Sequence, residues 1–215
     1  MALTLSNGTT VSISNGVDAA KTITATTNAN PGVSTSTAHG FNDGDYVVVN
    51  SGWVRLSERV VRVDNAATDT FELEGIDTSN TSIYPAGGGA GSAKKVVGWT
   101  QLTQILSSSS TGGEQQFWEG QFLEGDRQIR IPTTKSAAGI SFTIADDPTL
   151  PGYVLAKQAN DDRLPRAVML TLANGAKLLY NAYISLSTIP SLNVNEPMQV
   201  EVTLSLLADP SRYAS

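Results

Sequence analysis

Hydrophobic and polar positions alternate with a period of two along much of this chain. Near the N-terminus Val11 and Ile13 alternate with polar side chains. Ile140, Phe142 and Ile144 do the same further along the chain, as do Val200, Val202 and Leu204 near the C-terminus. Alternation of this kind is typical of strands that bury one face and expose the other. The pattern therefore predicts a mainly β protein.

Short segments rich in Asn, Asp and Gly separate the predicted strands. Asn174–Gly175 predicts a tight hairpin between the two apolar segments that flank it, and Asn15–Gly16 predicts another turn. A single helix is expected over about residues 150–160. Its start is placed at Asp146–Pro148, because a carboxylate cap followed by proline is common in a first helical turn.

The spacing of the strands changes along the chain. Residues 22–95 contain short strands with frequent turns, which predict a small β-domain inserted into a larger one built from residues 1–21 and 96–215. Each part carries a net charge of −3. The glycine-rich stretch 87–95 is expected to be a linker or an exposed hairpin tip. A second mobile loop is predicted from low complexity at Ser107, Ser108, Ser109, Ser110, Thr111, Gly112 and Gly113.

Composition excludes several functions. The net charge is −6 and the pI about 4.7, whereas a protein that binds DNA through its phosphates needs a basic face. The chain has no cysteine, which excludes disulfides, thiolate nucleophiles and cysteine zinc ligands. The N-terminal residues have no signal-peptide pattern, and no apolar run is long enough to cross a bilayer. We expect a soluble protein that is made in the cytosol.

His39, the single histidine, is the obvious candidate for chemistry. A metal site or general base needs partners, and there is no second histidine, no cysteine and no nucleophile-elbow motif. His39 is therefore predicted to be a turn residue that opens a strand. No catalytic residue, cofactor site or metal site is predicted, and the chain is not expected to be an enzyme. Trp53, Trp99 and Trp118 could form a stacking platform, but core or subunit contacts are favoured for them.

Two long segments are similar to a known family. Residues 122–148, which precede the predicted helix, and residues 170–206, which follow it, resemble the major tail tube proteins of long, flexible-tailed bacteriophages. Residues 34–77, with "AHGFNDGD" opening a strand and "TFELEG" closing the unit, resemble a small β-module that recurs in phage tail proteins. The resemblance implies a tail-tube-type β-sandwich or barrel with one flanking helix, and an inserted all-β domain on the outer tube surface.

The same resemblance implies a function. Six copies would form a ring, the sheets of a ring would join into an inner barrel, and stacked rings would form a negatively charged conduit for DNA ejection. DNA would pass without specific binding, and no membrane or cofactor would be involved. The expected partners are further copies of the chain and the tail terminator, tape measure and baseplate proteins. The protein would be assembled in the host cytoplasm and reside in the virion.

Particular residues follow as candidates. The segments 115–123 and 198–206 are expected to form the barrel wall, with Glu119, Glu124 and Glu201 facing the channel. The serine-rich loop at 107–113 is expected to contact a neighbouring ring.

Two alternatives stay open at this point. The chain could be another tail component, such as a terminator or a baseplate hub subunit. It could also be a carbohydrate-binding module for host attachment, with Trp53 and Tyr84 as surface contacts on the inserted domain.

Overall fold

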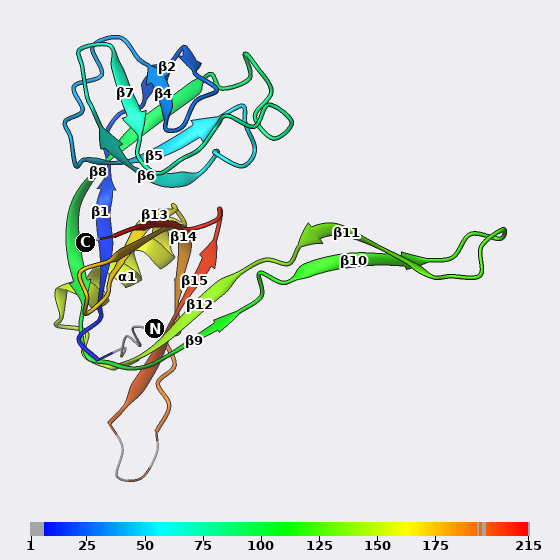
Figure 1. Ribbon diagram of the computed structural model, residues 1–215. Helices are drawn as coiled ribbons and strands as arrows, with labels where there is room; N and C mark the ends of the chain where they lie inside the picture. The colour runs from blue at the N-terminus through cyan, green and yellow to red at the C-terminus, as the bar shows by residue number, and fades with distance from the viewer. Residues whose placement is uncertain (1–6, 193, 195–196, 215) are drawn as a thin grey trace.

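The computed structural model describes residues 7–192, 194 and 197–214 and shows a mainly β protein with one helix (Figure 1). In the described part of the chain the elements are, in order, β1 (Thr10–Val17), β2 (Lys21–Ile23), β3 (Ala25–Thr26), β4 (Gly32–Thr35), β5 (Tyr46–Ser51), β6 (Arg59–Asp64), β7 (Thr70–Leu73), β8 (Gly91–Leu102), β9 (Ile105–Thr111), β10 (Gln115–Gly120), β11 (Ile129–Lys135), β12 (Gly139–Ala145), α1 (Pro151–Asp162), β13 (Arg166–Thr171), β14 (Lys177–Leu186), β15 (Gln199–Leu206) and β16 (Ser211–Tyr213). The predicted fold class is confirmed.

One antiparallel sheet runs through most of the molecule. Its strand order is β3-β4-β7-β6-β5-β8-β1-β13-β14-β15-β12-β9, with β2 also paired to β8 and β16 to β14. The strand β8 belongs to both halves of this sheet: residues 91–95 pair with β5, and residues 96–102 pair with β1. The predicted boundary between residues 95 and 96 thus falls inside a continuous strand.

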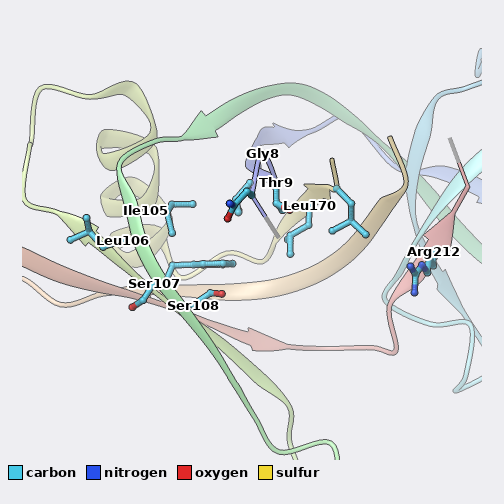
Figure 2. Close-up of a pocket in the computed structure, with 12 residues that line it drawn as sticks. Gly8, Thr9, Ile105, Leu106, Ser107, Ser108, Leu170 and Arg212 are labelled. Carbon is cyan, nitrogen blue, oxygen red and sulfur yellow. The ribbon is translucent and has the colours of Figure 1, made fainter. Parts of the chain in front are cut away.

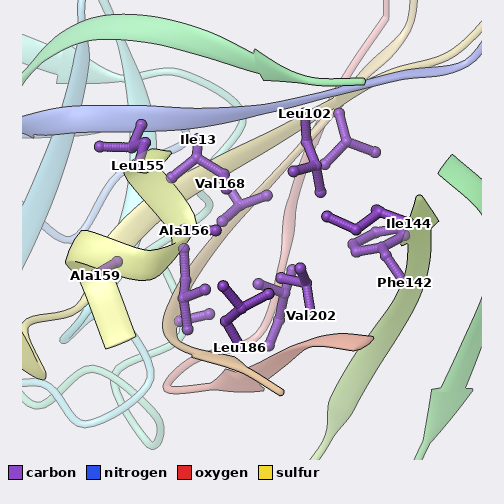
Figure 3. Close-up of a cluster of buried hydrophobic side chains, with 14 of the residues drawn as sticks. Ile13, Leu102, Phe142, Ile144, Leu155, Ala156, Ala159, Val168, Leu186 and Val202 are labelled. Carbon is purple, nitrogen blue, oxygen red and sulfur yellow. The ribbon is translucent and has the colours of Figure 1, made fainter. Parts of the chain in front are cut away.

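Each half of this sheet has a hydrophobic core, and a third, smaller cluster contains residues of both halves, namely Val60, Val96, Ala167, Leu179 and Tyr213. The larger core fills the space between α1 and the strands that curve around it (Figure 3), and it contains Val11, Ile13, Leu102, Phe142, Ile144, Leu155, Ala156, Ala159, Val168, Tyr180, Ala182, Ile184, Leu186, Val200, Val202 and Leu204. The inward-facing residues predicted from alternation in β1, β12 and β15 are therefore confirmed. The smaller core lies within the inserted segment, which we define as residues 22–95, and is formed by Ile23, Phe41, Val47, Val49, Trp53, Leu56, Val61, Val63, Phe71, Leu73, Ile76, Tyr84 and Ala93.

The helix α1 lies where it was expected, but it begins later. Leu150 is the N-cap residue and Pro151 occupies the first turn, so the predicted start at Asp146–Pro148 is wrong. The Asp147 carboxylate instead accepts hydrogen bonds from the Thr149 backbone N–H (3.0 Å) and hydroxyl (2.6 Å). These bonds close a turn before the helix, and they lower the pKa of Asp147.

The turn predicted at Asn15–Gly16 is also wrong, whereas the hairpin at Asn174–Gly175 is confirmed. The strand β1 continues to Val17, because β8 offers it a partner along its whole length. One pair, Asn15 with Gly98, is missing from this ladder. Gly98 has φ +60°, and a Cβ atom there would lie 2.6 Å from the nitrogen of the Asn15 side-chain amide. The Asn–Gly pair thus lies within the ladder, at a one-pair interruption that leaves the register unchanged.

His39 lies in the loop before β5, as predicted, and its ring is buried. Its Nδ1 accepts a hydrogen bond from the Phe41 N–H (2.9 Å), and its Nε2 lies 3.2 Å from the Thr70 carbonyl oxygen. The ring also packs against Phe41 and Phe71, with centroids 4.9 and 5.1 Å away. His39 therefore closes the turn by filling the core of the inserted segment.

The C-terminal strand connects the inserted segment to the rest of the chain. The Tyr213 hydroxyl accepts a hydrogen bond from the Arg62 N–H (2.9 Å) and donates one to the Glu74 carbonyl oxygen (3.2 Å). The Arg62 guanidinium lies over the Tyr213 ring, 4.7 Å from its centroid, and pairs with the Glu74 carboxylate. Nearby, the Asn181 amide donates to Glu58 (3.0 Å). These contacts fix the orientation of the inserted segment.

We expect His39→Ala to lower the free energy of unfolding by about 2–4 kcal/mol, because it removes a buried ring and two hydrogen bonds. Urea denaturation followed by circular dichroism measures this loss. Thr37→Ala, at an exposed position of the same loop, is the control and should change stability by less than about 0.5 kcal/mol. Equal stability of the two variants would contradict the role assigned to His39.

Tyr213→Phe should cost about 1–3 kcal/mol at neutral pH, because it leaves two backbone groups without their partner. Burial is the main cause that raises the pKa of Tyr213, so the neutral phenol is favoured in the folded state. The contribution of Tyr213 to the free energy of unfolding should therefore be fully present below pH ~10 and should fall as the pH rises further. The fall should be shallower for Tyr213→Phe than for the wild type. Parallel curves between pH 8 and 12 would refute this prediction.

Candidate functional site

A hydroxyl-rich face covers four neighbouring strands on the side opposite the larger core. Register places Ser141 beside Thr203 on one side and Ser109 on the other, and the Ser141 and Thr203 oxygens are 3.2 Å apart. We define the hydroxyl face by the side chains that alternate with the core residues of β9, β12, β14 and β15, namely Ser107, Ser109, Thr111, Ser141, Thr143, Tyr183, Ser185, Glu201, Thr203 and Ser205.

The hydroxyl face has a simple chemistry. Apart from Tyr183 and Glu201 its side chains are short, Glu201 is its one charged member, and this set contains no lysine or arginine. Attraction to a polyanion depends on cations that replace its counterions. A surface of hydroxyls with one carboxylate can lie next to a polyanion without holding it.

The second feature is an arm formed by β10 and β11. In the described part of the chain these strands pair with each other alone, and their ribbon projects away from the rest of the molecule (Figure 1). Apart from Gly120, every residue of both strands is exposed. Residues 115–123 thus lie outside the main sheet, whereas residues 199–206 lie in it as β15. That both segments form the wall of an inner barrel stays a prediction. A local alternation pattern cannot tell a ribbon from a sheet strand.

The two faces of the arm differ in polarity. On one face the Arg130 Nε lies 2.6 Å from the Glu119 carboxylate, and its guanidinium lies 4.6 Å from the centre of the Phe117 ring. Register places the other face in the line Trp118, Ile131 and Ile129, which we call the apolar stripe. A Cβ atom on Gly120 would lie 2.2 Å from the Trp118 ring, so this glycine leaves room for the indole.

The three glutamates predicted to face a channel lie in different places. Glu201 belongs to the hydroxyl face, Glu119 is paired with Arg130 on the arm, and Glu124 lies between β10 and β11 near the arm's tip. The structure does not bring them together as one acidic site.

The prediction of a mobile loop at Ser107–Gly113 is wrong for most of these residues. Ser107 to Thr111 belong to β9, which pairs with β12 from Thr143 to Gly139. Serine is a weak strand former. The backbone hydrogen bonds to β12 nevertheless hold this segment as a strand. Gly112 and Gly113, with φ of +74° and +77°, lead from β9 into the arm.

Trp53 and Tyr84 are not surface contacts. Their side chains are 2% and 7% exposed, and their rings meet edge to face with centroids 5.2 Å apart. The indole N–H donates to the Pro85 carbonyl oxygen (2.8 Å). The glycine-rich stretch packs over this indole, since a Cβ atom on Gly89 would lie 2.8 Å from it. The sequence alone did not predict this packing role, because it does not distinguish glycines that make room for an aromatic ring from glycines in a linker.

The cavities show no catalytic arrangement. One cavity, of about 720 Å³, lies between the start of β1 and β9 and is lined mainly by aliphatic and serine side chains, with Arg212 at one side (Figure 2). Among the described residues there is no cluster of three or more side chains that could hold a metal ion. Over the same residues, no helix has both the length and the apolar character needed to span a membrane.

Several solved structures are similar to this chain. A chain of the virion of a native gene transfer agent particle has a TM-score of 0.43 and 12% identity, over 54% of this chain and 89% of that one. A chain of the anti-feeding prophage tube-terminating cap gives 0.38 and 19%, over 54% and 83%. One of an extracellular contractile injection system sheath–tube complex gives 0.39 and 16%, also over 54% and 83%. No curated protein matches this chain.

A family model covers much more of the sequence. The model described as phage tail tube protein, TTP, matches residues 51–215. This range includes the hydroxyl face, the arm, the helix and the greater part of the larger core. The chain therefore belongs to the phage tail tube protein family, whose members are structural components of the virion and not enzymes.

Proposed function

We propose that this protein forms hexameric rings that stack into the tail tube, and that the tube is a conduit through which DNA is ejected into the host cell. The observation that carries the proposal, beside the family, is the hydroxyl face. It is a broad surface of one sheet without a cation, and Glu201 is its charged member. Such a surface suits the wall of a channel through which DNA slides.

Ring formation is supported by the edge of the main sheet. The strand β9 ends the strand order, and β12 is its one neighbour in the described part of the sheet. An edge strand carries unpaired backbone N–H and C=O groups, which another strand can complete. A neighbouring copy that pairs there would extend the hydroxyl face around a channel. The number six comes from the resemblance to tail tube proteins.

We propose that the inserted segment is a domain of its own on the outer surface of the tube. Its separate core and its connection through two adjacent strands support this. The main partners of the whole protein would be other copies of the chain. The tail terminator, tape measure and baseplate proteins would contact the ends or the lumen of the tube, after assembly in the host cytoplasm.

Electron microscopy of the purified, concentrated protein should show hollow tubes of stacked six-fold rings with outer projections. Val17 and Val96 pair across β1 and β8, so an Asn–Gly turn in place of residues 18–95 should close a two-residue hairpin. This variant should still form tubes, but without projections. Rings of another symmetry, or phage tails whose shaft consists of a different polypeptide, would refute the proposal.

The chemistry of the channel wall can be tested in phage particles that contain a variant protein. Glu201→Lys with Thr203→Lys adds three positive charges per copy to the hydroxyl face, which should attract DNA and slow its ejection about tenfold or more. Gln158→Lys with Asp161→Lys adds the same charge at exposed positions of α1 and should leave ejection unchanged. DNA release is measured by dye fluorescence after the particles are triggered. Equal slowing by both variants would exclude Glu201 and Thr203 from the channel wall.

A further inference from the structure

We infer that the apolar stripe of the arm binds a specific groove on a second copy of the chain, at the root of that copy's own arm. This inference rests on the proposed self-assembly and deepens it, because it names the two surfaces that meet. The donor surface is the line Trp118, Ile129 and Ile131. The acceptor surface is a groove of about 710 Å³ between the inserted segment and the ends of β12 and β15.

The stripe lacks a partner among the described residues of its own chain. Trp118, Ile131 and Ile129 are 48%, 47% and 39% exposed on a ribbon that stands apart from both cores. A two-stranded ribbon is marginally stable by itself and gains stability when an apolar face is covered. The opposite face also exposes one large ring, Phe117 at 44%, but there the Arg130 guanidinium lies over the ring and pairs with Glu119. The face that needs cover is thus the stripe.

The groove has a complementary shape and polarity. Its walls include Val54 and Leu207, whose side chains are 89% and 37% exposed, and Ile140 and Leu206 add apolar surface. Part of its lining consists of small residues at the root of the arm, namely Gly112, Gly113, Ala137 and Ala138. Small residues beside exposed aliphatic ones leave space for a large side chain such as the Trp118 indole.

Charge permits a second copy as the occupant. Each copy carries a net charge of −6, so copies repel unless they meet through surfaces without net charge. The stripe has no ionisable group, and the two charged residues of the groove, Lys135 and Asp209, neutralise each other at 3.2 Å. The larger cavity is less suitable, because Arg212 lines it and the chain's own residues 7–9 form one of its sides.

The geometry also excludes self-occupation. The arm extends away from its own root (Figure 1), so its stripe cannot turn back into the groove that lies there. Every copy carries one stripe and one groove on different surfaces. A contact between such unlike surfaces is heterologous and repeats from copy to copy, as a ring or a stacked tube requires.

The natural absence of cysteine permits a direct test. Ile131→Cys supplies a thiol on the stripe and Leu207→Cys supplies one on the groove. The two variants are mixed in equal amounts, assembled and treated with a short bismaleimide linker. We expect a cross-linked dimer on a denaturing gel from the mixture and not from either variant alone.

Two further thiols serve as controls in the same experiment. Glu119→Cys lies on the opposite face of the arm, and Leu106→Cys lines the larger cavity. Cross-linking of Leu207→Cys to Glu119→Cys as efficiently as to Ile131→Cys would overturn the assignment of the stripe. Preferential cross-linking of Ile131→Cys to Leu106→Cys would overturn the assignment of the groove. Tubes that form without any of these cross-links would refute the inference and leave the proposed function standing. Failure of the wild type to assemble would refute both.

A second variant tests the energetic role of the stripe. Ile129→Thr with Ile131→Thr keeps the strand propensity of the arm and removes its aliphatic surface. The concentration needed for tube formation should rise about tenfold or more, a factor that corresponds to about 1.4 kcal/mol. Circular dichroism of the unassembled protein should be unchanged. Thr133→Ser, also on β11, is the matched control, and equal assembly of the two variants would contradict the inference.

Discussion

The shared strand β8 is the constraint on which the arrangement of this protein depends. Its first five residues complete the sheet of the inserted segment and the remainder holds β1 in the main body. A flexible linker would leave the two cores free to move relative to each other. Because β8 is continuous, the sheet of the inserted segment is instead an extension of the sheet of the main body. Tyr213, near the C-terminus, contacts Arg62 and Glu74 of the inserted segment. These contacts fix the angle between the inserted segment and the main body. Any projection that the inserted segment forms on an assembly is thus held in one orientation.

The main body uses strand alternation for two purposes at once. In β12 and β15 the inward side chains, such as Phe142 and Val202, build the core, and the outward ones, such as Ser141 and Thr203, build the hydroxyl face. A one-residue shift in register would exchange the two sets, so burial of the core also determines the chemistry of the opposite surface. A surface that contains few charges is thereby produced by the same pairing that stabilises the fold.

The arm follows a different logic. Trp118, Ile129 and Ile131 share one face of it, as the apolar residues of a core strand do, yet in the described chain its strands have no neighbour beyond each other. The face with Arg130 is complete within the arm, whereas the stripe is complete only if another molecule covers it. Exposed apolar surface of this kind commonly marks an interaction site.

The sequence by itself determined the β class, the single helix and the inward residues of β1, β12 and β15, because these follow from the period of the pattern and from local turn chemistry. Tertiary structure alone decided where β9 and β10 lie, since a serine run becomes a strand only when β12 pairs with it and an apolar ribbon becomes an arm only when no sheet receives it. It also decided that Trp53 and Tyr84 are buried and that Glu119 is paired with Arg130. The physical reason is the same in each case: periodicity records which side chains share a face, but the neighbour that covers the face comes from a distant part of the chain.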